Sequence, residues 1–314
     1  MAIKNFHDYF FVAFKRWIEL IKQKVDTKIE RCFDNEKNDV LTELTKFSSS
    51  SVEVSNCFNQ VLQFWKLINW PDSFGADILF NELIESLSRA IIRYANLVKD
   101  SNQAIINSTS SSQTSIPTSN NMDEQTNSSL YTNKPLDTYQ KLTITTNNIE
   151  RVRESLTSFL TEVETQRQNH GTSSTNVPLT PDKLKLIETN RAQFETFISE
   201  TNEYLIQIIE HSLNIIVNTK IIVDLQPHMF YLFESPESAP AQESISRIVR
   251  YLDENLVVYK ELSYKNNFER FLKIIWIRLI EEFETNLRKD DTVCKIFIDY
   301  SNIIKGVKAH YFKF

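Results

Sequence analysis

The segment Tyr251–Ile280, YLDENLVVYKELSYKNNFERFLKIIWIRLI, decides the fold. After a short polar break, its large apolar side chains recur at steps of three and four residues, continuing just beyond the segment: Phe268, Phe271, Leu272, Ile275, Trp276, Leu279 and Phe283. An α-helix turns every 3.6 residues, so this spacing gathers them on one face. The part before the break has the same amphipathic character. The segment therefore predicts two amphipathic helices, each with a buried face.

Glycine is scarce in the whole chain. Only 3 of the 314 residues are glycine, whereas an average usage of about 7% would give roughly 22. Tight β-turns and phosphate-binding loops need glycine where φ is positive or where the backbone approaches a ligand closely. Packing of helix ridges into grooves does not need it. We therefore predict an all-α protein, an elongated rod of stacked antiparallel helical bundles.

Charge and hydropathy argue against two classes of partner. The chain has 35 basic and 41 acidic residues, a net charge of −6, and the two signs are interleaved along it. Nucleic-acid binding depends on clustered Lys and Arg, so we predict none. The most apolar stretch, residues 205–223, contains Glu210, His211 and Lys220, and the N-terminus is a poor signal peptide. We expect a soluble cytoplasmic protein without direct membrane insertion.

Metal-binding and catalytic patterns are not evident in the sequence. The cysteines are widely spaced, at Cys32, Cys57 and Cys294. No histidine lies one helical turn from another histidine or a cysteine, the positions being His7, His170, His211, His228 and His310. Phosphate-loop, dinucleotide and nucleophile-elbow motifs are missing. We predict no metal site, no cofactor and no catalytic residue, and hence a protein that is not an enzyme.

Apolar periodicity divides the chain into helical and soft segments. Helices are predicted over residues 8–33, 52–68, 74–98, 139–163 and 182–223, with three or four more over 241–312. Residues 101–137 are rich in Ser, Thr, Asn and Gln, so we predict that they are disordered. Residues 166–181 are expected to form a second soft loop. Residues 227–240 contain three prolines and are predicted to be a hinge or a docked loop.

The order of residues in several segments is more specific than their apolar periodicity. The opening segment reads Tyr-Leu-Asp-x-Asn-Leu, a break with Asn, then Phe-x-Arg-x-Leu-x-x-x-Trp. This resembles the second Munc-homology region of the MUN-domain vesicle-priming proteins, the uncoordinated/Munc family. Three earlier blocks follow the family's order and resemble its first Munc-homology region: the Trp/Phe-rich helix 6–33 with the later Pro71-Asp72, Arg93-Tyr94-Ala95-Asn96-Leu97, and the Asn147-Asn148 segment ending in Arg153.

The resemblance implies a domain organisation and a function. The first Munc-homology region would cover residues 1–165. A connecting helix and Pro-rich loop would cover 166–240, and the second Munc-homology region would cover 241–314. The implied fold is a rod like those of vesicle-tethering complexes. The implied activity is non-enzymatic: binding of syntaxin-type SNAREs or their complexes, together with other priming or tethering proteins, to promote SNARE assembly in exocytosis. No lipid-binding C1 or C2 pattern is present, so a peripheral membrane location through partners is expected.

One binding site can be carried over by position. In the family, an Asn and a Phe three residues later line a pocket for the syntaxin linker, at a fixed distance before the Pro-Asp break. Counting back from Pro71-Asp72, these positions fall on Asn59 and Leu62. Residues three apart are neighbours on a helix. Either Asn59 binds an incoming segment that packs on Leu62, or Asn59 is solvated and Leu62 belongs to the core.

A second group of residues gives an alternative. The aromatic residues Phe230, Tyr231 and Phe233 lie in the proline-bounded segment, where they either anchor a partner or cover the protein's own surface. An aliphatic Leu62 in place of the family's aromatic favours a different function. The chain would then be a helical tether or scaffold that binds a small GTPase or a tethering complex without SNARE-opening activity.

Overall fold

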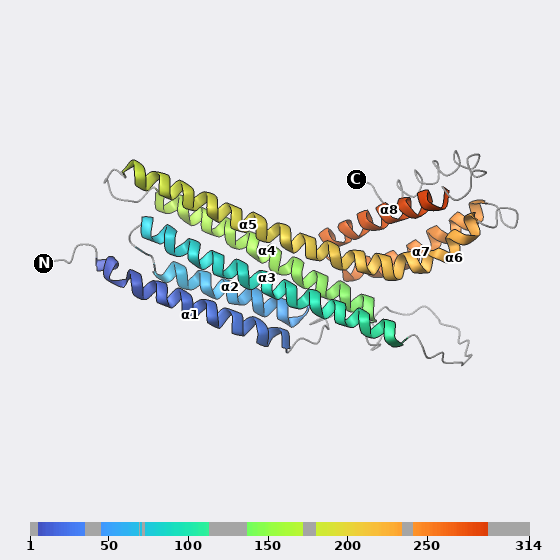
Figure 1. Cartoon of the computed structure of the whole chain (residues 1–314), viewed down its shortest axis with the longest axis horizontal. Coiled ribbons are helices and arrows are strands. Elements are labelled where there is room, and N and C mark those ends of the chain that lie inside the picture. Colours follow the sequence, from blue (N-terminus) through green and yellow to red (C-terminus); the bar gives the residue numbers. More distant parts are fainter. Residues whose placement is uncertain are drawn as a thin grey trace. The chain divides into compact units, whose positions relative to one another are not determined.

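The structure is a computed structural model that describes residues 6–34, 45–68, 70, 73–112, 137–171, 180–233 and 241–287 (Figure 1). All regular structure in these ranges is helical: α1 (Phe6–Asp34), α2 (Ser49–Ile68), α3 (Ser73–Ser112), α4 (Thr138–Gly171), α5 (Pro181–Ile216), the π-helical turn η1 (Val217–Ile221), α6 (Ile222–Phe233), α7 (Ala241–Leu262) and α8 (Lys265–Leu287). The predicted all-α bundle class is confirmed for this part of the chain. A rod built from such bundles stays a prediction.

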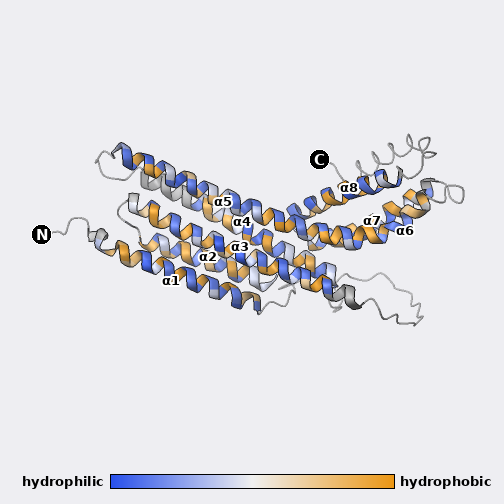
Figure 2. Ribbon diagram, in the orientation of Figure 1, coloured by the Kyte–Doolittle hydropathy of each residue, from blue (hydrophilic) through white to orange (hydrophobic). Residues whose placement is uncertain are grey.

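The helices form two compact units. Unit 1 contains the described residues of Met1–Ser108 and Asn148–Ile208, and unit 2 contains those of Thr109–Asn147 and Ile209–Phe314. Thus α1, α2 and most of α3 belong to unit 1, α6 to α8 belong to unit 2, and α4 and α5 contribute residues to both. Figure 2 shows hydrophobic and hydrophilic residues on different sides of individual helices, as the apolar periodicity predicts.

The core of unit 1 is organised around an aromatic side chain of α3. The ring of Phe80 lies 5.2 Å from that of Trp65 in α2, 6.3 Å from Phe159 in α4 and 6.0 Å from Phe194 in α5. Helix α1 packs on α2, where Trp17 stacks on Phe64 at a centroid distance of 4.2 Å. Aromatic pairs at these separations add to the stabilisation that burial itself supplies.

Buried hydrogen bonds fix the start of α2. The Ser48 backbone N–H donates to Asn148 Oδ1 at 2.9 Å, and Asn148 Nδ2 donates to Ser48 Oγ at 2.6 Å. Two residues later, the hydroxyls of Ser50 and Tyr94 lie 2.8 Å apart. Buried polar groups are costly unless they are paired, so these contacts specify where α2 begins.

The Asn147 side chain has a corresponding role in unit 2. Asn147 Nδ2 donates to the Leu262 carbonyl at 2.7 Å, at the end of α7. Its Oδ1 accepts from the Tyr264 backbone N–H at 3.1 Å and from Asn267 Nδ2 at 3.2 Å. One amide therefore pairs groups on both sides of the turn between α7 and α8. The motif that begins at Asn147 in the sequence thus anchors a helix–helix connection.

Helix α3 is longer than predicted. The prediction of disorder from residue 101 is wrong for residues 101–112, which are helical. The polar composition concealed side chains that pack: Asn102 is buried, and Ile105 and Ile106 are half-buried. Helix α4 likewise extends to Gly171, beyond the predicted loop start at 166, because residues 164–168 are mainly good helix formers.

The prediction of a hinge or loop at residues 227–240 is wrong for residues 227–233. These residues belong to α6, with Pro227 inside the helix. Proline removes a helical hydrogen bond and disfavours this position. The apolar residues Leu225, Met229 and Leu232 are nevertheless buried, and α6 packs on α7. Burial of this stripe outweighs the local cost of the proline.

A π-helical turn interrupts the long helix that was predicted over residues 182–223. In this turn, η1, the Ile222 backbone N–H bonds to the Val217 carbonyl, five residues back. Within this turn, the Thr219 carbonyl accepts a hydrogen bond from the Tyr139 hydroxyl at 3.2 Å. The remaining predictions lie outside the described residues: the disordered segment over 113–136, the Pro71-Asp72 break, the second soft loop over 172–179, the loop over 234–240 and further helices after 287.

Candidate partner-binding surface

Helix α2 has one buried and one exposed face. The buried face carries Val54, Ser55, Cys57, Phe58, Val61 and Leu62. The exposed face carries Glu53, Asn56, Asn59, Gln60, Gln63, Phe64 and Leu67. Exposed carboxamides therefore share this face with two large apolar side chains. We call Asn56, Asn59, Gln63, Phe64 and Leu67 the α2 surface.

Asn59 lies at the edge of the α2 surface that borders α4. Two contacts bracket it on this edge: Ser155 Oγ donates to Ser55 Oγ at 2.9 Å, and Lys66 forms an ion pair with Glu162. A side chain four residues after Ser55 and seven before Lys66 points to the same side of the helix. The Asn59 amide makes no hydrogen bond within the part of the chain that the structure describes. It is therefore available to a partner.

Leu62 lies beneath the α2 surface. Its side chain is 1% exposed, whereas Asn59 is exposed. Residues three apart are separated by about 60° around a helix, and the boundary between core and solvent runs between these two. In this structure Leu62 supports the helix that presents Asn59, and it does not line an open pocket.

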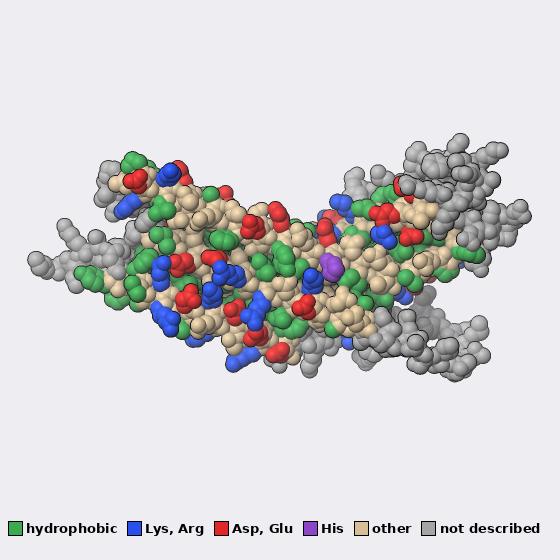
Figure 3. Space-filling model, in the orientation of Figure 1, with side chains coloured by type: hydrophobic (Ala, Val, Ile, Leu, Met, Phe, Trp, Pro, Cys, Tyr) green, Lys and Arg blue, Asp and Glu red, His purple; other side chains and the backbone are tan. Residues whose placement is uncertain are grey.

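Apolar side chains are exposed at the end of α2 and along α1. Leu67 is 82% exposed and Phe64 is 41% exposed, although one side of the Phe64 ring stacks on Trp17. On α1 the exposed large side chains are Tyr9, Phe10, Val12 and Leu20. Figure 3 shows hydrophobic side chains at the surface over the start of α1, with charged ones farther along. Large apolar side chains exposed in such numbers on two packed helices favour an interaction surface.

One of the three aromatic side chains predicted as a partner anchor lies in the described part of α6. The Phe230 side chain is 52% exposed. Tyr231 and Phe233 follow it in the same helix, and their side chains lie outside the described ones. Phe230 is therefore accessible to a partner, while the grouping of the three aromatics stays a prediction.

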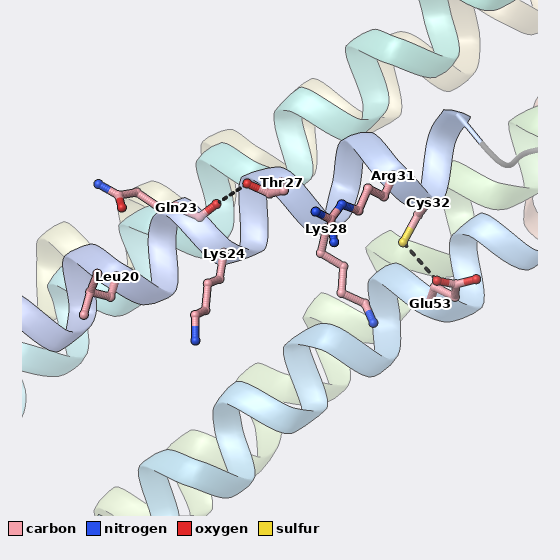
Figure 4. A pocket seen from close by; sticks show the side chains of 8 residues that line it. All are labelled: Leu20, Gln23, Lys24, Thr27, Lys28, Arg31, Cys32 and Glu53. Atoms are coloured by element: carbon pink, nitrogen blue, oxygen red, sulfur yellow. Dashed lines mark hydrogen bonds between the residues drawn. The ribbon is translucent and has the colours of Figure 1, made fainter.

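A pocket of about 610 Å³ lies between α1 and α2 (Figure 4). Its lining is mainly charged or polar: Leu20, Gln23, Lys24, Thr27, Lys28, Arg31, Cys32 and Glu53. We call this pocket the basic groove. At one end, Cys32 Sγ donates to Glu53 Oε2 at 3.2 Å. Burial and this carboxylate contact raise the pKa of the Cys32 thiol from 9.0 to about 12, so the thiol is protonated at neutral pH.

The sequence prediction missed the basic groove because it considered consecutive residues. No run of Lys or Arg occurs along α1, yet Leu20, Lys24, Lys28 and Arg31 are spaced by four, four and three residues. That spacing aligns them on one side of a helix. The periodicity test that identified the apolar stripes would have found this row if it had been applied to charged residues.

Two kinds of site are not seen among the described residues. No group of three or more His, Cys, Asp or Glu side chains there is arranged to hold a metal ion. In the same ranges, no helix combines the length and apolar character that crossing a bilayer requires.

The sequence of this chain is similar to those of several known proteins. BAI1-associated protein 3 of Mus musculus is 21% identical over 281 residues, which is 90% of this chain and 21% of that protein. Protein unc-13 homolog D of Homo sapiens is 29% identical over 99 residues, 32% of this chain and 9% of that protein. Protein unc-13 homolog 4B of Drosophila melanogaster is 27% identical over 95 residues, covering 30% and 8% respectively.

The chain spans about a fifth or less of the length of these relatives. No family model matches it. Two of these relatives are unc-13 proteins, and unc-13 is the uncoordinated family to which the sequence motifs pointed. Similarity to unc-13 proteins and to BAI1-associated protein 3 thus confirms that the chain resembles the MUN-domain family.

Proposed function

We propose that the chain is a non-enzymatic regulator of vesicle exocytosis. In this proposal it binds syntaxin-type SNAREs or their complexes and promotes SNARE assembly during vesicle priming. The observation that carries the proposal is the exposed, unbonded Asn59 amide on a helix whose opposite face is buried. Similarity to unc-13 proteins supports the choice of partner.

The α2 surface has the composition that recognition of an extended or helical segment requires. A carboxamide can both donate to and accept from the backbone of a partner. The neighbouring Phe64 and Leu67 offer apolar area that association would remove from water. The buried Leu62 and Phe58 hold α2 in place, so little ordering would be needed on binding. On this proposal the protein acts in the cytoplasm and reaches the vesicle or plasma membrane through its partners.

The test is a pull-down of syntaxin-type SNAREs and assembled SNARE complexes with purified wild type and Asn59→Ala. We expect the substitution to weaken binding by about tenfold, the effect of losing an interface contact worth about 1.4 kcal/mol. Gln207→Ala is the matched control, because Gln207 is an exposed carboxamide on α5 of the same unit. Equal binding by wild type and Asn59→Ala would mean that Asn59 does not belong to the SNARE-binding site. Absence of binding by the wild type would refute the proposed partner.

The exposed Phe230 favours a second candidate function. A helical tether could use α6 to bind a small GTPase or a tethering complex without acting on SNAREs. Phe230→Ala would then abolish capture of that partner, while Asn59→Ala would leave capture unchanged. The reverse pattern would favour the SNARE proposal.

A further inference from the structure

The basic groove has properties that neither the proposed function nor the α2 surface uses. On α1, the side chains of Leu20, Lys24 and Lys28 are exposed at steps of four residues, and Arg31 continues the row. With a rise of about 1.5 Å per residue, the row is about 16 Å long. Lys24 and Lys28 form no ion pair or hydrogen bond within the described residues. In Figure 4 both side chains extend from α1 toward α2.

This row differs from the α2 surface in position. The contacts Trp17–Phe64 and Cys32–Glu53 show that α1 and α2 run antiparallel, with Glu53 at the edge of α2 that faces α1. Asn59 lies about 120° away around α2, at the edge that borders α4. The two surfaces can therefore be altered separately.

The arrangement of charges indicates the shape of the ligand. Successive cations lie one helical turn apart, about 6 Å along the axis, so they do not converge on one point as a site for a single phosphate would require. The Glu53 carboxylate at the far end would repel a compact anion. A partner helix with carboxylates at matching four-residue steps would meet the cations one by one.

The two ends of the basic groove differ in character, and this difference defines the direction in which a partner helix would lie. Leu20, 44% exposed, and the nearby Trp17–Phe64 pair make one end apolar. Glu53 makes the other end acidic. A complementary helix would therefore carry an apolar residue, then a row of acidic residues, then a basic or amide residue.

We propose that the basic groove between α1 and α2 docks an acidic amphipathic helix of a partner protein. Charge complementarity favours this occupant, since the groove presents a cationic row on a chain whose net charge is −6. The proposal does not depend on SNARE binding at Asn59. Its test uses the full chain and a defined probe.

The probe is a fluorescent designed helix with Leu, then three Glu, then Lys at steps of four residues, so that each Glu meets one of the three cations, and its binding is followed by fluorescence anisotropy. We expect saturable binding that weakens as salt concentration rises. The double variant Lys24→Glu with Lys28→Glu should weaken it by about tenfold, and the neutral pair Lys24→Gln with Lys28→Gln by about threefold. The matched control, Lys183→Glu with Lys185→Glu, makes the same charge change at exposed positions of α5 and should leave binding within about twofold.

Three outcomes would overturn the proposal. The first is equal weakening by the α5 control, which would mean that only net charge matters. The second is equal binding of a probe with the same composition in scrambled order. The third is failure of the wild type to bind the probe while it binds vesicles of anionic phospholipid through Lys24 and Lys28. Circular-dichroism melting of each variant identifies any that do not fold, and the glutamine pair then carries the test.

Discussion

Asn59 and Leu62 show how two neighbouring residues divide binding from stability. Leu62 is buried, so Leu62→Ala should lower the free energy of unfolding by about 2–5 kcal/mol through lost burial and a residual cavity. Asn59→Ala should change it by no more than about 0.5 kcal/mol, since it alters an exposed side chain. Urea unfolding followed by circular dichroism measures both.

Replacing Leu62 by the family's aromatic gives a second comparison. Leu62→Phe adds volume to a filled core and should cost about 1–3 kcal/mol. A gain in stability would instead mean that the core beneath α2 has room for an aromatic ring. In that case the position could accommodate the family's side chain without rearrangement.

The buried carboxylate of Glu150 provides a different residue-scale prediction. Glu150 is fully buried and pairs with Arg153 Nη2 at 2.6 Å, and Arg153 Nη1 also donates to Asn202 Oδ1 at 3.0 Å. Hydrogen bonding to Glu150 raises the pKa of Arg153. Glu150→Ala would leave the guanidinium half-buried without its counter-charge and should destabilise unit 1 by about 3 kcal/mol. The measurement is thermal or urea unfolding, with Glu188→Ala, an exposed glutamate on α5 of the same unit, as the control.

At the scale of elements, the adjacent residues Asn147 and Asn148 form a matched pair. Asn147 bonds to the turn between α7 and α8, and Asn148 bonds to Ser48 before α2. Substitution by Ala leaves the paired groups of each turn unsatisfied, at a cost of about 1–3 kcal/mol. Asn147→Ala should therefore speed hydrogen exchange at residues 262–267, and Asn148→Ala at residues 48–52.

Hydrogen exchange measured by mass spectrometry compares the exchange rates of residues 48–52 and 262–267 in the two variants. Each serves as the control for the other, because the substitution is the same and only the bonded turn differs. Faster exchange in both turns for both variants would contradict the separate anchoring of the two turns.

At the scale of the whole molecule, alkaline pH should destabilise the fold. Burial, with the Glu53 contact, raises the Cys32 pKa to about 12, and burial raises the pKa of Tyr251 and Tyr259 as well. Above about pH 9 the unfolded chain has lost thiol protons that the folded chain keeps, so the free energy of unfolding falls as pH rises. Below that pH these groups do not change it.

Urea midpoints at pH 7.5, 9 and 10 measure this dependence. Cys32→Ala should make the decline between pH 9 and 10 shallower than in the wild type. If the urea midpoint of Cys32→Ala declined as steeply as that of the wild type, groups other than Cys32 would be responsible for the pH dependence.

The sequence predicted the helices whose apolar residues recur regularly, and it failed where a long-range contact decided the structure. The stripe from Phe268 to Leu279 predicted α8 because its signal is local. Residues 101–112 and Pro227 looked unfavourable for helix, yet Asn102 and Met229 are buried against neighbours that periodicity does not reveal. For the candidate site, the sequence left Leu62 either in the core or at a binding pocket, and its burial places it in the core. A binding role for Asn59 stays a prediction.

The buried thiols of Cys32 and Cys57 can report how often α1 separates from α2. Both are buried, and burial raises the pKa of each, so neither is a reactive thiolate at neutral pH. A thiol reagent should label them only during transient separation of α1 from α2. With Cys294 replaced by Ser, the labelling rate would report how often that separation occurs in the native protein. A partner bound across both helices should slow the rate by the factor by which it stabilises the closed form.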